Sequence, residues 1–198
     1  MVIGAWNSAI LTPDWIAKFM FGLKTGEQVA VEVPLNIHQP WRVRHEGLAV
    51  IVGPAGLEVA ADPGTFDALT RAKQCAKAAI DRLPQTPLVA VGFNVRYRSS
   101  DTPPELASAI DCPIDTIISE AGFTIGDRRL SRSFAVGEGL INFEVVADCT
   151  GSAAVQFNFH KADSDYTALQ RWLDMEQRTV REEVNKIIEK LPGVIISD

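Results

Sequence analysis

Arginine is the residue type whose placement in this sequence points most directly to chemistry. Two pairs, Arg42 with Arg44 and Arg96 with Arg98, are each two residues apart inside segments that alternate like β-strands. Residues two apart in a strand project from the same face, and a guanidinium offers a planar fork of donors that suits carboxylate or phosphate. Seven of the 12 arginines lie in or beside predicted strands: Arg42, Arg44, Arg96, Arg98, Arg128, Arg129 and Arg132.

The candidate ligand-binding residues follow from the same alternation. They share the polar side of their predicted strands, which we expect to face away from the helices: Arg96, Arg98, Asn94, Asn142, Glu144 and His160. A half-covered antiparallel sheet also has an ordinary wet face, on which cross-strand Arg and Glu pairs serve solubility alone. The sequence leaves both interpretations open.

Motifs of the common catalytic chemistries do not occur in the sequence. It contains neither G-x-S-x-G nor S-x-x-K for acyl transfer, and neither of the glycine-rich nucleotide motifs. His38, His45 and His160 lack the spacing of metal ligands. We therefore name no catalytic residue, no metal site and no cofactor, and whether the chain is an enzyme stays open.

The three cysteines are predicted to be buried thiols. Cys75, Cys112 and Cys149 are odd in number and far apart, without the C-x-x-C spacing of zinc or redox sites. A free cysteine commonly behaves as a small hydrophobic residue. We expect no reactive thiol.

Composition places the chain among folded, cytoplasmic proteins. With 198 residues and 46% hydrophobic residues it has enough apolar side chains for a core. It lacks the roughly 18 uninterrupted apolar residues of a membrane span, and its first residues lack a basic region followed by an apolar one. The formal charge of -6 argues against binding to nucleic acid or to anionic lipid, both of which require a basic surface.

Hydrophobic periodicity predicts strands and helices in the order of an α+β protein. Apolar stripes at helical spacing run over 66–83 and 169–191, and each stripe ends at a Leu-Pro pair. Two short helices are predicted to begin at Thr12-Pro13 and Thr102-Pro103, with Thr as the N-cap. Strands are predicted at 28–33, 41–45, 48–52, 57–61, 88–98, 123–125, 130–136, 140–147 and 154–160.

Short identities recur in one order and predict an internal duplication, with residues 1–85 as the first repeat and 86–198 as the second. The separation between matched residues grows from 87 to 108 along the chain, as insertions in loops would produce. The final increase of eight residues falls within the second long helix and would lengthen it by about two turns. The matches are Asn7 with Asn94, Thr12-Pro13 with Thr102-Pro103, Glu46-Gly47-Leu48 with Glu138-Gly139-Leu140, Ala68-Leu69-x-Arg71 with Ala168-Leu169-x-Arg171, and Leu83-Pro84 with Leu191-Pro192.

Each predicted repeat is a β-α-β(3-4)-α unit. Neither repeat covers its own sheet edge and helix layer, so we expect the two to pack as one globular unit. The expected result is one twisted antiparallel sheet with the helices on one face. This order of elements resembles the TATA-binding-protein-like fold, although the acidic charge argues against a shared function in DNA binding.

These observations favour a binding or assembly protein over an enzyme. The leading hypothesis is that the polar sheet face, or the sheet edge, engages another protein or a second copy of the chain. The alternative is an enzyme or carrier that holds a small anionic ligand in a groove between the two halves, where the nominated donors are mostly arginines. Nucleic acid is not an expected partner, and no membrane interaction is predicted.

Overall fold

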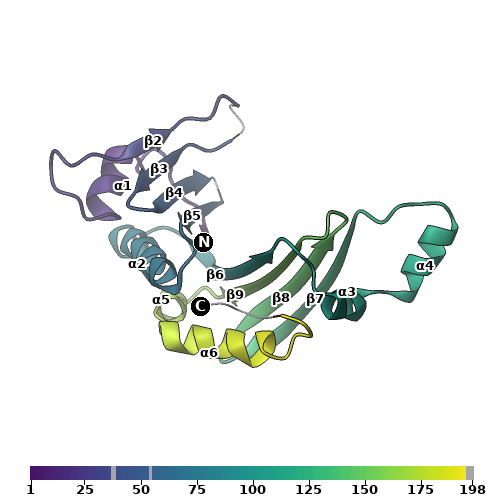
Figure 1. Cartoon of the computed structure of the whole chain (residues 1–198). Helices are drawn as coiled ribbons and strands as arrows, with labels where there is room; N and C mark the ends of the chain where they lie inside the picture. The colour runs from purple at the N-terminus through teal and green to yellow at the C-terminus, as the bar shows by residue number, and fades with distance from the viewer. Residues whose placement is uncertain (37–38, 54, 195–198) are drawn as a thin grey trace. The chain divides into compact units, whose positions relative to one another are not determined.

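The computed structural model describes residues 1–36, 39–53 and 55–194 (Figure 1). His38 therefore lies outside the described residues. The chain divides into two compact units. Unit 1 comprises Met1–Phe93 and His160–Gln177, and unit 2 comprises Asn94–Phe159 and Arg178–Asp198.

Each unit combines strands with helices, and two strands, β6 and β9, contribute residues to both units. Unit 1 holds β1 (Val2–Gly4), α1 (Pro13–Phe19), β2 (Ala30–Glu32), β3 (Arg42–His45), β4 (Leu48–Gly53), β5 (Gly56–Ala61), α2 (Phe66–Arg82), the first half of β6 (Leu88–Ser99) and α5 (Tyr166–Leu173). Unit 2 holds the rest of β6, α3 (Pro104–Ile110), α4 (Pro113–Glu120), β7 (Asp127–Val136), β8 (Gly139–Asp148), most of β9 (Ala153–Ala162) and α6 (Gln177–Ile188), whose first residue belongs to unit 1.

The described strands form one antiparallel sheet, so the predicted α+β class with an antiparallel sheet is confirmed. The order of its nine strands is β2-β3-β4-β5-β1-β6-β9-β8-β7. Within residues 1–36, 39–53 and 55–194 the chain also forms six helices. In the same part of the chain, no helix has the length and apolar character needed to span a membrane.

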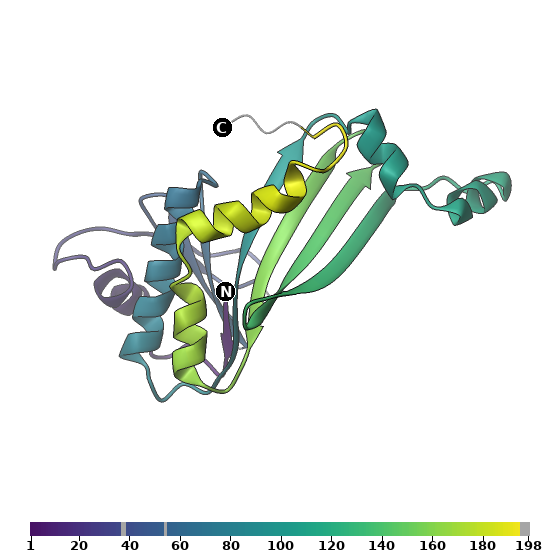
Figure 2. The same ribbon diagram turned by 90° about the horizontal axis from the view of Figure 1, so that it is seen from below.

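The core of unit 1 lies between its strands and α2. Helix α2 packs on β5, α1 packs on β3, and both α1 and α5 contact α2 (Figures 1 and 2). Side chains of α2 on the inner stripe are buried, among them Ala76, Ala79 and Ile80, as the predicted apolar periodicity requires. Thr65 caps this helix by accepting a hydrogen bond from the backbone N–H of Ala68.

The core of unit 2 lies on one side of its long strands. Alternate residues of β8 and β9 are buried, and the rings of Phe143 and Phe157 meet with their centroids 5.3 Å apart. Helix α6 lies across one face of these strands (Figure 2) and buries Val180, Val184 and Ile188. The opposite face of the strands has no such cover from α6, and its side chains alternate with the buried ones.

The helix predicted over 169–191 is wrong as a single element, because α5 and α6 are separate helices. The break follows Asp174, which ends α5. Two lysines of α2 hold the broken segment: Lys73 Nζ donates to the carbonyl of Met175, and Lys77 Nζ lies 2.5 Å from Asp174 Oδ2. The apolar spacing runs on through the break, so periodicity alone could not reveal it.

Two predictions for 101–125 are also wrong. Thr102 is not the N-cap of a helix, because its hydroxyl donates to the carbonyl of Gly151 and α3 begins after Pro103 without a side-chain cap. Residues 123–125 form no strand; they follow α4, a helix without buried residues in which Ile117 is 64% exposed. Gly122 ends that helix with φ +85°, which sends the chain into a loop.

The tripeptide that we matched at 46–48 and 138–140 takes different places in the two hairpins. Leu48 is the first residue of β4 after its turn, whereas Leu140 is the second residue of β8. A shift of one residue moves a side chain to the other face of a strand. Accordingly Leu48 is 5% exposed and Leu140 is 42% exposed. These residues are therefore not structural equivalents, and the proposed boundary at residue 85 stays a prediction.

The prediction of three buried thiols holds only for Cys75. Cys112 lies at the start of α4 and Cys149 in the turn after β8, and both are exposed. Burial raises the pKa of the Cys75 thiol to about 12.

We expect a thiol reagent such as DTNB to modify Cys112 and Cys149 rapidly in the native protein and Cys75 only after denaturation. Rapid modification in a Cys112→Ser, Cys149→Ser variant would contradict the burial of Cys75.

Lys73 provides a test of the junction between α5 and α6. Its side chain is buried, and the pKa of its ammonium is lowered, first by that burial. Between this lowered pKa and the ordinary value of 10.5, the unfolded chain therefore binds more protons than the folded chain. As a result, the contribution of Lys73 to the free energy of unfolding rises as pH rises through that window. We expect the free energy of unfolding of the wild type to rise relative to that of Lys73→Met over this range, measured by denaturant titration. A difference that does not change with pH would contradict the burial of this charge.

Candidate functional site

The water-facing side of β6, β9, β8 and β7 in unit 2 carries five of the six nominated residues. Asn94, Arg96 and Arg98 follow one another at every second position of β6, and all three are exposed. Asn142 and Glu144 occupy the same alternation in β8 and are half-buried. Since the residues between them face the core, the strand pleat itself positions these side chains.

A chain of side-chain hydrogen bonds crosses the four strands of this face. The hydroxyl of Ser133 donates to Asn142 Oδ1 at 2.6 Å, and Asn142 Nδ2 donates to Asn158 Oδ1 at 3.0 Å. Asn158 Nδ2 then donates to Asn94 Oδ1 at 2.7 Å. The chain runs in one direction and ends on β6, where the amide N–H groups of Asn94 remain as donors. We call these four residues the amide ladder.

Glu144 is already engaged by an arginine of the neighbouring strand. Arg129 Nη1 lies 3.3 Å from Glu144 Oε1, and Arg129 Nε lies 3.0 Å from Asp127 Oδ2. The hydrogen bond that Arg129 donates to Asp127, together with the charges of both carboxylates, raises the pKa of Arg129 above its ordinary value. This cluster matches the cross-strand charge pairs of an ordinary wet face, so Glu144 is not a free acceptor for a ligand.

Arg96 and Arg98 differ from the other arginines of unit 2 strands, because neither guanidinium has a partner among the described residues. Arg129 is paired with Asp127 and Glu144. Arg128 Nε lies 3.1 Å from Asp111 Oδ1 and 2.5 Å from Asp115 Oδ2. Asn94, Arg96 and Arg98 therefore form a row of exposed donors along β6. We call these three residues the donor row.

His160 is the nominated residue that the structure does not group with the rest. It is the first residue of β9 that belongs to unit 1, whereas the other five belong to unit 2. Its side chain is half-buried. In the described part of the chain, no three His, Cys, Asp or Glu residues lie close enough together to hold a metal ion.

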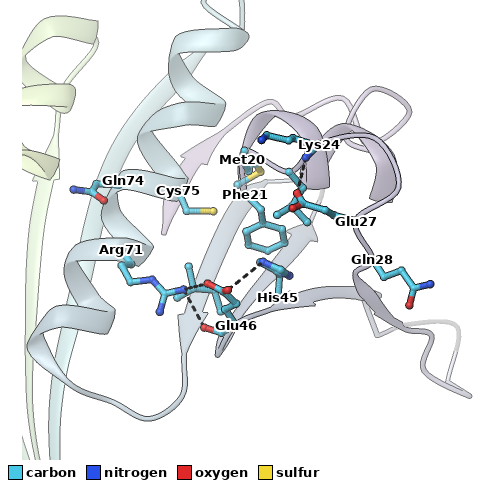
Figure 3. Close-up of a pocket in the computed structure, with 13 residues that line it drawn as sticks. Met20, Phe21, Lys24, Glu27, Gln28, His45, Glu46, Arg71, Gln74 and Cys75 are labelled. Carbon is cyan, nitrogen blue, oxygen red and sulfur yellow. Dashed lines mark hydrogen bonds and ion pairs between the residues drawn. The ribbon is translucent and has the colours of Figure 1, made fainter.

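A pocket in unit 1 was not predicted from the sequence. It has a volume of about 640 Å³ and lies between the loop after α1, the β3–β4 hairpin and α2 (Figure 3). Met20, Leu48 and Cys75 contribute apolar, buried surface, and Lys24, Glu46 and Arg71 contribute charge. Glu46 and Arg71 belong to the short identities shared with Glu138 and Arg171. Sequence spacing could not show that the three distant segments lining this pocket meet.

Comparison with protein-family models, with curated proteins and with solved structures found no match. The candidate sites therefore rest on the geometry of this chain alone. The polar face of unit 2 offers several N–H donors at fixed spacing, an arrangement that can bind a ligand rich in hydrogen-bond acceptors.

The amide ladder can be tested through its stability contribution. Asn158→Ala removes the central link, but the freed groups of Asn94 and Asn142 regain water because they are accessible, so we expect a loss of only about 0.5–1.5 kcal/mol in the free energy of unfolding. Gln156→Ala is the matched control on the same strand and face. In a double-mutant cycle, Asn158→Ala with Asn94→Ala should lose less than the sum of the single losses. Strict additivity would contradict the hydrogen bond between these two amides.

Proposed function

We propose that this chain is a non-enzymatic binding protein whose donor row, Asn94, Arg96 and Arg98, engages an acidic surface of a partner protein. The single observation that carries the proposal is that two neighbouring guanidinium groups have no partner among the described residues. Of the other strand arginines of this unit, Arg128 and Arg129 are paired with carboxylates, and Arg132 donates to the carbonyl of Ser131. An exposed strand of donors is suited to carboxylates, which accept two parallel hydrogen bonds from one guanidinium.

Solvation explains why unpaired arginines on this face favour a binding role. If the face served solubility alone, a carboxylate partner would stabilise Arg96 and Arg98 as Glu144 stabilises Arg129. Arg96 and Arg98 instead stay exposed, and their donors must exchange water for acceptors when a partner arrives. Charge complementarity of this kind raises the association rate and selects among partners more than it raises raw affinity.

The proposal includes an internal duplication and the TATA-binding-protein-like arrangement of strands. Read outward from β1 and from β6, one side runs β1-β5-β4-β3-β2 and the other runs β6-β9-β8-β7, so the first side has one strand more. In both series the first strand of the half is central and the later strands follow in reverse chain order. This supports a repeated unit, although its residue matches need a register different from Leu48 over Leu140. A cytoplasmic location, expected from the sequence, belongs to the same proposal.

The experiment is a titration by fluorescence anisotropy with a short labelled peptide of alternating glutamate and glycine. We expect Arg96→Gln with Arg98→Gln to weaken binding by about tenfold, because two exposed charge pairs together are worth on the order of 1.4 kcal/mol. Arg42→Gln with Arg178→Gln removes the same two charges from exposed positions elsewhere and should retain most of the affinity. Binding should also weaken as salt rises.

Three results would contradict this function. Equal losses in both double variants would mean that net charge alone drives binding. Tighter binding of a labelled DNA duplex than of the peptide would assign the face to nucleic acid. Thermal stabilisation by citrate or pyrophosphate without peptide binding would favour the small anionic ligand. Light scattering identifies the case in which the acidic partner is a second copy, since the mass would then rise with concentration in the wild type and not in Arg96→Gln, Arg98→Gln.

A further inference from the structure

We infer that the pocket of unit 1 binds a small, flat, apolar molecule that carries one carboxylate. The pocket volume of about 640 Å³ is within the range of roughly 300–1,000 Å³ that is usual for ligand sites. Its apolar part is formed by Met20, Leu48 and Cys75, which are 6%, 5% and 4% exposed. Burial keeps the Cys75 thiol protonated, with a pKa of about 12, so the sulfur acts here as apolar surface.

Two rings on one wall of the pocket favour a flat ligand. The rings of Phe21 and His45 lie with their centroids 5.6 Å apart and tilted by 42°, and Figure 3 shows both side chains directed into the space beside Glu46. Aromatic rings pack best in offset or tilted arrangements at such separations. A planar apolar body entering the pocket would extend this arrangement without displacing a charged group.

The charged groups of the rim favour an anion over a cation, because the carboxylates are already engaged. Glu46 lies 3.2 Å from Arg71 Nη2 and 3.9 Å from His45 Nε2, and Glu27 Oε2 accepts a hydrogen bond of 2.6 Å from the backbone N–H of Lys24. The ammonium of Lys24 has no partner within the described residues.

Arg71 supplies the second set of donors. Its Nη2 atom is used twice, by the carbonyl of Glu46 at 3.1 Å and by the carboxylate at 3.2 Å. The remaining guanidinium nitrogens make no hydrogen bond to a described residue. Figure 3 shows the Arg71 side chain beside Glu46 at the edge of the pocket. A ligand carboxylate can therefore bind Lys24 or Arg71 without breaking the pair between Arg71 and Glu46.

The test uses the methionine methyl groups of the full chain as local reporters. The sequence has three methionines, Met1, Met20 and Met175, and of these Met20 lines the pocket. With carbon-13 methyl labelling, titration with naphthoate should move the Met20 signal in a saturable manner and leave Met1 and Met175 in place. Naphthylmethanol, the neutral analogue, should bind at least about tenfold more weakly, because it cannot form charge-assisted hydrogen bonds.

Substitutions at the rim distinguish a specific site from unspecific absorption of an aromatic molecule. We expect the double variant Lys24→Gln, Arg71→Gln to weaken naphthoate binding by about tenfold or more, and the two single variants to show which cation binds the carboxylate. Lys190→Gln, an exposed lysine of unit 2, is the matched control and should leave the titration unchanged. Thermal melting checks that the double variant still folds. If it does not, the comparison of naphthoate with naphthylmethanol on the wild type tests the role of the cations by itself.

Each other outcome overturns the inference. A Met20 signal that does not move means that the pocket does not bind this class of ligand. Equal binding of naphthoate and naphthylmethanol removes the role of the cations. Parallel movement of all three methyl signals indicates unspecific binding. Because Arg96 and Arg98 are absent from this pocket, failure here leaves the acidic-partner proposal for unit 2 untouched, and failure there leaves this one untouched.

Discussion

The alternation of buried and water-facing side chains along β8 and β9 is the constraint on which unit 2 depends. Every second residue of these strands, such as Phe143 and Phe157, is buried, which fixes one face for the core and for α6. The side chains between them must point to the opposite, water-facing side of the sheet, because the pleat has a period of two. The polar groups of Asn142 and Asn158 must then be satisfied on the open side, and they are satisfied by one another.

The same constraint explains why the free donors gather on β6. The amide ladder joins β7 to β6 through one row of side chains, and Arg129 uses the carboxylates of its own strand and of β8. Beyond Asn94, β6 continues for several residues toward Ser99 with Arg96 and Arg98 on the open face. The carboxylate of Glu144 is already engaged by Arg129. The structure thus separates a self-satisfied part of the face from a part that still has donors to offer.

Unit 1 depends on contacts between helices more than on a single face. Tyr166 donates from its hydroxyl to the carbonyl of Ile80, and Gln170 Nε2 lies 2.5 Å from Asp81 Oδ1, so α5 lies along the C-terminal half of α2. Lys73 and Lys77 continue this contact past the end of α5. Helix α2 therefore carries α5 on one side, while Arg71 and Cys75, from other positions of the same helix, line the pocket.

Much of the fold could be predicted because alternation and helical periodicity report local burial. The stripe over 66–83 gave α2 almost residue by residue, and the strand at 88–98 matches β6 closely. Contacts between distant segments were the part that periodicity could not report. The break between α5 and α6 depends on Lys73 reaching Met175, and a free carbonyl in a loop leaves no trace in hydrophobic spacing.

The candidate sites also depend on contacts between distant segments, which the sequence could not report. Arg96 and Arg98 could be nominated because two residues of separation fix a shared face, yet the sequence could not tell that Arg129, with the same chemistry, would be neutralised by Asp127 and Glu144. An arginine's role is set by which carboxylates the fold brings to it. In the pocket of unit 1, Arg71 shares one nitrogen with Glu46 and keeps others, so its capacity to bind is reduced without being lost. Residue type therefore identifies where anions can bind, and the pairing within the fold decides how much of that capacity remains.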